Sequence, residues 1–574
     1  MARLGPNPRE TGALPVGEFD ALIVGAGFSG LYLLHRLRNG LGFSVRVHEA
    51  GGDVGGTWYW NRYPGARCDS ESIYYCFSDH LSEELLEEWT WSERYATQPE
   101  ILRYLQHVAD KLDLRRDIQF NSRVAAAVYD EATSRWTIST EDGGRATATF
   151  LITAVGCLSV ANIPEFPGRE TFQGKWYHTG QWPHAGVDFT GQRVAVIGTG
   201  ATGVQVIPEV APRAAHVYAL QRTANYDIPG WNRPLDPEYV RETKTNYKEI
   251  WQKARESMLG LPYAVPDRSA LDVTPEERQR IYEEAWAKGG FRIGAETFND
   301  LLLKEESNET AAEFIRSKIR QIVRDPEVAE LLAPKDHPFF TKRPPLEHGY
   351  YEAFNRDNVT LVDVRRSPIQ EITPKGVRTR DAEYEVDAIV FATGFDAMTG
   401  ALFNMGIRGR GGVALKERWA AGPRTYLGIA TRDFPNLFMI TGPQSPSVLS
   451  NMPVSIEQHA DWIADCLTYM RQHDLDEVEP LLEAEDDWVA HHTEVAAATL
   501  LPKANSWWVG ANIPGKPRAL YPYVGGVGNY RRICDDVAAK GYEGFAMAKH
   551  GAFPPTGVRP SARPPARPAR QVLG

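Results

Sequence analysis

Two segments of the chain share one pattern: a short apolar run, a turn rich in glycine, and a second apolar run. Ala21–Arg38 reads ALIVGAGFSGLYLLHRLR, and Arg193–Gln205 reads RVAVIGTGATGVQ. Each pattern predicts a buried strand, a tight turn and a helix. The glycines let the backbone approach a pyrophosphate, and the helix N-terminus favours negative charge. Each segment is therefore predicted to begin a dinucleotide-binding unit.

The residue at the end of the second predicted strand distinguishes the two units. Ser44–His48 is followed by Glu49, whose carboxylate can take the ribose hydroxyls of an adenosine and repels a 2′-phosphate. His216–Leu220 is instead followed closely by Arg222, whose guanidinium can pair with a phosphate in forked geometry. The first unit therefore suits FAD or NAD, and the second suits NADP. Together they imply a hydride passing from NADPH to a bound flavin.

Other stretches fill in the architecture. Gln98–Leu114 has a helical pattern, and Val124–Thr149 alternates in short strands, like a β-meander inserted in an FAD domain, before the apolar strand Phe150–Val155. Pro237–Ala333 is rich in Glu, Lys and Arg and carries helix-start signals, which predicts a helical insertion that could wall a substrate cavity. Gly442–Pro453 precedes an amphipathic helix, whose N-terminal dipole could stabilise negative charge on a reduced flavin.

The predicted fold class is α/β, with two Rossmann-like dinucleotide-binding domains, one for FAD and one for NADP, and a helical insertion. Because one unit is inserted in the other, the domains should be discontinuous along the chain. The expected boundaries are a flexible segment at 1–20, the FAD domain at 21–160 and 386–550, the NADP domain at 165–225 and 336–385, the insertion at 226–335, and a disordered Pro/Arg tail at 551–574.

Composition narrows the partners. The chain has 574 residues, 43% of them hydrophobic, and a net charge of -11, which argues against nucleic acid and against a general membrane-surface role. Because no apolar run is long enough to span a bilayer, we expect a cytoplasmic protein. We further expect a monomer that binds small molecules. The chain has five cysteines: Cys68, Cys76, Cys157, Cys466 and Cys534. They include no C-x-x-C pair, so we expect reduced thiols, no disulfide framework and no metal site.

Two motifs carry a family resemblance. Phe172–Pro183 reads FQGKWYHTGQWP, and Gly55–Asp69 reads GGTWYWNRYPGARCD. The first resembles the fingerprint of Baeyer-Villiger monooxygenases in its spacing of Phe, Gly, His, Trp and Pro, and the second matches another pattern of the same family. In the related flavin-containing monooxygenases Trp182 would be Tyr or Phe. The chain is thus identified as similar to Baeyer-Villiger monooxygenases over almost its whole length.

The resemblance implies a reaction and roles for particular residues. NADPH reduces FAD, O2 adds to the flavin C4a, and the resulting peroxide attacks a ketone substrate to give an ester or lactone. Arg343 stands where the family places its active-site arginine, which stabilises that peroxide, and Asp69 orients it. Lys342 would turn to the NADP 2′-phosphate, while His178 and Trp182 would move as a hinge between the cofactor units.

The residues expected to contact the cofactors form a larger set, in which Trp507 resembles the family tryptophan that folds over NADP. They are Gly25, Gly27, Ser29, Gly30, Glu49, Thr57, Trp58, Arg67, Asp69, Tyr75, Gly198, Thr199, Gly200, Thr202, Gly203, Gln205, Arg222, Thr223, Lys342, Arg343, Met452 and Trp507.

Two alternatives remain open beside this reading. A flavin-containing monooxygenase would oxidise nitrogen or sulfur centres with the same cofactors but without the arginine. A non-catalytic FAD- and NADP-binding protein would instead serve a partner. A flavin disulfide reductase is disfavoured because no C-x-x-x-x-C follows Gly30. The chain also departs from its relatives at Gln444, where glycine is usual, and at Pro344 and Pro345, where less rigid residues are usual.

Overall fold

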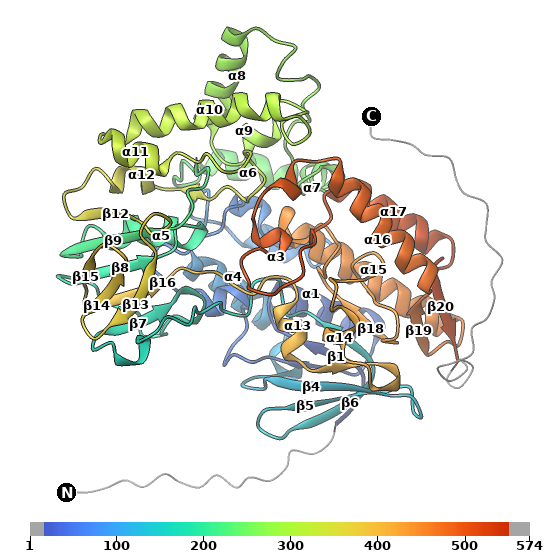
Figure 1. The fold of residues 1–574 in the computed structure, drawn as a ribbon. Coiled ribbons are helices and arrows are strands. Elements are labelled where there is room, and N and C mark those ends of the chain that lie inside the picture. Colours follow the sequence, from blue (N-terminus) through green and yellow to red (C-terminus); the bar gives the residue numbers. More distant parts are fainter. Residues whose placement is uncertain (1–16, 550–574) are drawn as a thin grey trace, which may run out of the picture.

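The computed structural model describes residues 17–549. It shows two sheet-based units side by side, with α8 to α11 lying over one unit and α15 to α17 running along the other (Figure 1). The predicted tail at 551–574 lies outside the described residues. Within them, no helix combines the length and the apolar character needed to cross a membrane.

The first unit is built on an eight-stranded sheet with the order β17-β4-β5-β6-β1-β2-β3, and β18 also pairs with β6. The predicted meander is present as the antiparallel run β4 to β6. The strands are β1 (Gly17–Val24), β2 (Val45–His48), β3 (Ile118–Gln119), β4 (Val124–Asp130), β5 (Arg135–Thr140), β6 (Arg145–Thr153), β17 (Ile407–Arg408) and β18 (Leu437–Met439).

One boundary of this unit differs from the prediction. The flexible segment expected at 1–20 ends earlier, since β1 begins at Gly17 and its first residues pair with Ala146–Ala148 of β6. The extra pairing satisfies backbone groups that a flexible segment would leave to water. The sequence signal failed because Gly17 and the prolines before it suggest a loop, whereas the partner strand lies more than a hundred residues away.

The second unit holds a five-stranded, fully parallel sheet with the order β12-β9-β8-β16-β7. We expected the strand near Val390 to re-enter the first unit, but β16 lies between β8 and β7 in this sheet. Parallel neighbours are chosen by tertiary packing, which the local sequence does not encode. The strands are β7 (Lys175–His178), β8 (Arg193–Ile197), β9 (His216–Gln221), β12 (Val359–Asp363) and β16 (Ala388–Phe391).

The expected helical insertion is present between β9 and β12. Thr274 caps α8 by accepting from the backbone N–H of Glu277 at 3.2 Å, and Asp325 caps α11 in the same way, so both predicted helix starts are confirmed. The insertion comprises α6 (Pro237–Thr245), α7 (Tyr247–Glu256), α8 (Pro275–Lys288), α9 (Arg292–Ala295), α10 (Glu305–Ile322) and α11 (Pro326–Leu332).

The remaining elements include α5 of the second unit, helices of the first unit and short connections. The helices are α1 (Phe28–His35), α2 (Thr57–Trp60), α3 (Glu83–Glu88), α4 (Gln98–Lys111), α5 (Ala201–Val210), α12 (Tyr350–Ala353), α13 (Gly400–Asn404), α14 (Leu415–Arg418), α15 (Met452–Gln472), α16 (Leu482–Ala497) and α17 (Val527–Ala539). The short strands pair as β10 (Ile228–Pro229) with β11 (Leu346–Glu347), β13 (Ile369–Thr373) with β14 (Gly376–Thr379) and β15 (Glu383–Glu385), and β19 (Glu477–Pro480) with β20 (Phe545–Ala548).

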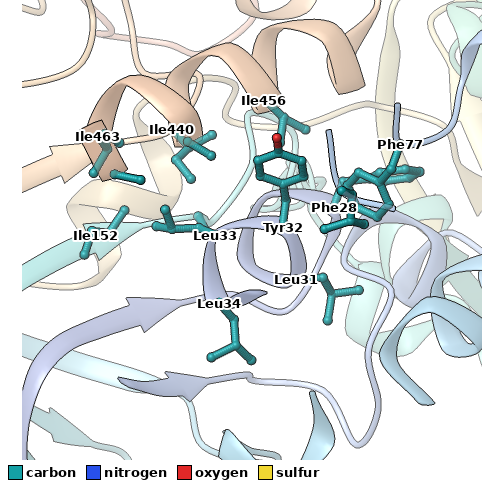
Figure 2. Close-up of a cluster of buried hydrophobic side chains, with 14 of the residues drawn as sticks. Phe28, Leu31, Tyr32, Leu33, Leu34, Phe77, Ile152, Ile440, Ile456 and Ile463 are labelled. Atoms are coloured by element: carbon teal, nitrogen blue, oxygen red, sulfur yellow. The ribbon is translucent and has the colours of Figure 1, made fainter. Parts of the chain in front are cut away.

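The core of the first unit lies where α1 crosses α15. Leu33 and Tyr32 of α1 point toward Ile456 and Ile463 of α15 (Figure 2). The apolar face predicted for this helix is buried as expected, including Ala460. Burying one such aliphatic side chain is worth about 1.5–3 kcal/mol, so the helix is held by packing along its length.

The chain crosses between the units twice, and the crossings lie together. Ala161 on the first crossing forms an antiparallel bridge with Phe395 on the second. The N–H of Asn162 donates to the oxygen of Gly394 at 2.9 Å, and the hydroxyl of Thr393 donates to the oxygen of Asn162 at 2.6 Å. The joint between the units is therefore a two-stranded connection held by hydrogen bonds across its strands.

Candidate active site

The first glycine loop is shaped by close packing. Gly25 has φ +107°, and a Cβ there or at Gly30 would overlap a backbone carbonyl oxygen, so only glycine fits. Gly198 and Gly203 repeat this arrangement in the second loop. By contrast, a Cβ on Gly200 would meet nothing within 4 Å.

Both loops leave the helix N-termini open. Gly27 caps α1 and Gly200 caps α5, and neither helix has a side-chain hydrogen bond at its cap. The first N–H groups of each helix therefore lack a side-chain acceptor, which suits the phosphates of a dinucleotide. Ser29, another expected contact, lies in the first turn of α1. The two loops fit the FAD and NADP expected from the sequence.

Glu49 lies buried at the end of β2, where the sequence placed it. One carboxylate oxygen accepts from the N–H of Ala26 and the other from the N–H of Gly51, each at 2.7 Å. Burial raises the pKa of Glu49, and these backbone donors act in the opposite direction. The side chain thus fixes the glycine loop to the end of the second strand, and its contact with a ribose stays a prediction.

The aromatic loop that follows packs against the first helix. Trp58 donates its indole N–H to the hydroxyl of Tyr75 at 3.3 Å, and Tyr75 meets the ring of Phe28 edge-on at 5.2 Å. Thr57 begins the short helix α2 directly before Trp58. Three of the predicted cofactor residues therefore form a connected wall beside the first glycine loop.

Two other predicted cofactor residues contact each other. Gln205, in α5 of the second unit, donates to the backbone oxygen of Arg67 at 3.2 Å and accepts from the hydroxyl of Tyr63 at 2.8 Å. The guanidinium of Arg67 lies 3.7 Å from Glu93 and donates to the oxygen of Tyr95. Arg67 and Gln205 therefore join the two units here, a role that the sequence did not suggest.

Arg343 and Asp69 form the predicted pair. Arg343 Nε donates to one carboxylate oxygen of Asp69 at 2.6 Å, and Nη2 donates to the other at 2.9 Å. Nη1 donates to the backbone oxygen of Val448 at 2.8 Å, and the ring of Phe291 lies 4.8 Å from the guanidinium carbon. Burial disfavours the charge, but Asp69 more than offsets it, so the pKa of Arg343 is raised. This arginine is a permanent, oriented cation.

Lys342 lies near charged residues other than those around Arg343. Burial lowers its pKa, and the nearby Arg222 and Arg365 lower it further, while Asp336 acts to raise it. Among residues 17–549, no carboxylate lies within 4.0 Å of Lys342 or Arg222. Two neighbouring cations without a carboxylate partner suit the phosphate that the sequence predicts here. Thr223 follows Arg222 directly at the end of β9.

His178 lies at the joint between the units. Its Nδ1 accepts from the N–H of Gly180 at 3.0 Å, and its ring meets Phe395 of the second crossing edge-on at 6.0 Å. Burial lowers the pKa of His178 to about 4, so the ring is neutral at physiological pH. Trp182 is buried against Tyr177, at 5.4 Å between ring centroids, and belongs to the core of the second unit.

A cavity with about 660 Å³ of empty space, its open mouth included, lies between the insertion and the C-terminal loops. Its walls are mainly apolar, and Arg343 is the only charged residue that residues 17–549 contribute to them. The lining comprises Ser70, Met258, Leu259, Leu261, Phe291, Leu302, Phe340, Arg343, Pro344, Pro446, Leu449, Ser450, Asn451, Leu501, Trp508, Tyr523, Val524 and Gly526. The insertion therefore walls the cavity, as predicted.

Some of these wall residues were missed by the sequence reasoning. Trp508 lines the cavity, and its ring contacts that of Trp507, the residue expected to fold over NADP, at 5.8 Å. Nothing in the local pattern distinguishes the two tryptophans. Phe291 carried no signal, because it lies in the insertion far from any motif. Met452 begins α15 next to the wall residue Asn451, as expected.

Two dinucleotide-type loops and a mainly apolar cavity with one oriented arginine are the features of a flavin- and nicotinamide-dependent oxidoreductase. Residues 20–236 match the family model described as flavin-binding monooxygenase-like. The chain is 48% identical to a Baeyer-Villiger monooxygenase of Pseudooceanicola batsensis, covering 92% of this chain and 95% of the relative. It therefore belongs to the Baeyer-Villiger monooxygenases, as predicted.

Further relatives define the range of the family. The solved structure of an oxidized steroid monooxygenase bound to NADP is 51% identical, with a TM-score of 0.89, and the alignment covers 93% of this chain and all of that chain. This likeness confirms the predicted fold class. The phenazine N-monooxygenase PhzNO1 of Lysobacter antibioticus is 44% identical, covering 92% of this chain and 97% of the relative. Relatives of similar identity thus differ in the atom that their names say they oxidise.

Proposed function

We propose that this protein uses FAD, NADPH and O2 to insert one oxygen atom next to a ketone carbonyl, giving an ester or lactone. When bound, FAD would supply the redox chemistry that transfers an oxygen atom from O2, with NADPH as the reductant. The observation that carries the proposal is the Arg343–Asp69 pair at the wall of the cavity. Family membership supports the same reaction.

Arg343 supplies the electrostatic part of catalysis. A guanidinium has five N–H donors, and three of them are held by Asp69 and Val448, so two remain for the reacting oxygen atoms. Because the pKa of Arg343 is raised, the positive charge persists at working pH. Asp69 fixes the plane of the guanidinium, so little reorganisation is needed as negative charge develops on the substrate oxygen.

The cavity supplies the dry surroundings. Apolar side chains such as Leu261, Leu449 and Val524 form most of its wall, so few protein groups there compete for a proton or hold water. In such surroundings the cation of Arg343 would stabilise negative charge on a reacting oxygen atom more strongly than it would in water. The same wall binds the carbon skeleton of the substrate.

On the second unit, Arg222 and Lys342 hold the 2′-phosphate of NADPH. His178 and Trp182 lie where the two units join, and we assign them to the motion that carries the nicotinamide between its positions for reduction and for oxygenation. A monomer contains all of these parts, because each named residue belongs to one chain.

Oxidation of nitrogen is the second candidate, favoured by the relative named as a phenazine N-monooxygenase. Attack by a nitrogen lone pair needs no cation to stabilise a tetrahedral adduct. The oriented Arg343 therefore favours the ketone reaction over the nitrogen reaction in this chain.

The test is turnover of a panel of aryl, cyclic and polycyclic ketones, and of aromatic N-heterocycles, with NADPH under ¹⁸O2. Esters or lactones that carry one ¹⁸O, formed in proportion to the NADPH consumed, are expected. Products that are exclusively N-oxides, or NADPH consumption that no compound alters, would overturn the proposal.

A further inference from the structure

One cavity residue has a polar atom without a partner. Trp508 is 2% exposed, and its indole N–H is buried with no acceptor within reach among residues 17–549. Buried polar atoms in folded proteins are almost always hydrogen-bonded, because leaving one unpaired costs about 1–3 kcal/mol. An unpaired donor in a cavity wall is available to a ligand that brings the acceptor.

The surroundings of Trp508 are apolar. The side chains in its cluster include Leu501, Val524, Val448 and Met398, none of which offers a strong acceptor. Tyr523, in the same cavity wall, differs in this respect, since its hydroxyl already contacts His491 at 2.9 Å and accepts from Asn529 at 3.1 Å. Trp508 is thus a wall residue whose N–H has no protein acceptor among residues 17–549, unlike the hydroxyl of Tyr523.

The reacting carbonyl does not need this donor. Arg343 retains two unused N–H groups, and they suffice for the oxygen atom that develops charge. The tryptophan comes from the loop after α16, whereas Arg343 follows α11, so the two donors enter the cavity from different parts of the chain. A ligand that contacts both residues can offer a separate acceptor to each.

We propose that Trp508 selects ketones that carry a second oxygen acceptor, such as an ester or another carbonyl, away from the reacting carbonyl. The inference rests on the proposed function and deepens it by naming the class of substrate. Trp508 acts here as a specificity-determining residue, and its contribution belongs to substrate binding rather than to the oxygen insertion.

The test compares two ketones of similar size, 4-propylcyclohexanone and ethyl 4-oxocyclohexanecarboxylate, which differ in the distal acceptor. The wild-type holoenzyme should have the higher kcat/KM for the ester-bearing ketone. Trp508→Phe, which removes the N–H, should reduce that preference about tenfold, through KM rather than kcat. Replacement of Trp508 by 3-benzothienylalanine keeps the shape of the ring without the donor, and it should give the same result if Phe proves too small.

Tyr523→Phe is the matched control, because the hydroxyl that it removes already has partners. It should change both ketones alike. Calorimetric binding of the two ketones to the oxidised holoenzyme with NADP⁺ should reproduce the ratio without turnover.

An unchanged ratio in both Trp508 variants would overturn the inference, as would a rise in the KM for NADPH alone, which would assign the donor to the cofactor. A wild-type enzyme that oxidises both ketones without preferring the ester would also overturn it. A wild-type enzyme that oxidises neither ketone, nor any other in the panel, would instead contradict the proposed function.

Discussion

One added methyl group has different consequences at different glycines of the two loops. A methyl group on Gly30 would overlap the carbonyl oxygen of Gly25, whereas one on Gly200 would enter open space at the second loop. Substitution by alanine should therefore reduce stability at Gly30 and weaken cofactor binding at Gly200. The difference separates glycines needed for packing from a glycine needed for a ligand.

Gly30→Ala is predicted to displace α1 from β1, so the protein should lose flavin and its melting temperature should fall by several degrees. Gly200→Ala should leave flavin content and melting temperature unchanged and should raise the KM for NADPH, because the added methyl group lies where the pyrophosphate is expected. Thermal melting monitored by flavin fluorescence, with NADPH kinetics, distinguishes the two. Equal losses of stability would contradict this account of the loops.

Cofactor choice is also decided by single residues. Arg222→Ala removes a charge-assisted contact to the 2′-phosphate, which is worth roughly 1.5–3 kcal/mol, so the KM for NADPH should rise about ten- to a hundredfold. The KM for NADH, which lacks that phosphate, serves as the internal control and should stay the same. If the variant keeps the wild-type KM for NADPH, the assignment of this site fails.

Gln444 has a φ of +69° although it is not glycine. Its side-chain oxygen accepts from the N–H and the hydroxyl of Thr425, at 2.9 and 2.8 Å. These two bonds offset the cost of the left-handed backbone, which is about 1–2 kcal/mol. The departure from the family's glycine noted in the sequence is thus accommodated locally, in a buried turn rather than at the cavity wall.

At the scale of elements, the end of β7 depends on a neutral histidine. The pKa of His178 is lowered from 6.5 to about 4, so the unfolded chain binds a proton more readily than the folded protein between these values. The stability contributed by the neutral ring is complete above pH 6.5 and is lost as the pH falls toward 4.

The joint should therefore weaken in mild acid. Between pH 7.5 and pH 5, His178 should account for about 2 kcal/mol of lost stability, and His178→Gln, which cannot titrate, should lose that much less. Melting of both proteins at the two pH values provides the measurement, and the other buried histidines cancel in the comparison. Equal losses would show that the ring is not held neutral at the joint.

At the scale of the whole molecule, the sequence predicted what local patterns encode. Glycine spacing predicted both loops. Glu49 predicted an adenosine without a 2′-phosphate, and Arg222 predicted one that carries it. The family motifs led to the pairing of Asp69 with Arg343. Contacts between distant segments were not predictable in this way. The place of β16 in the second sheet and the presence of Trp508 in the cavity wall depend on packing across hundreds of residues.

The central claim is that Arg343, held by Asp69, serves oxygen insertion and not flavin reduction. The direct measurement follows both half-reactions in one variant by stopped-flow absorbance and product analysis. Arg343→Ala should still bind flavin and be bleached by NADPH, yet it should form no ester and should release hydrogen peroxide instead. Arg343→Lys should rescue little, because an ammonium cannot match the forked geometry, and Asp69→Ala should be milder. Ester formation at the wild-type rate in Arg343→Ala would contradict the account.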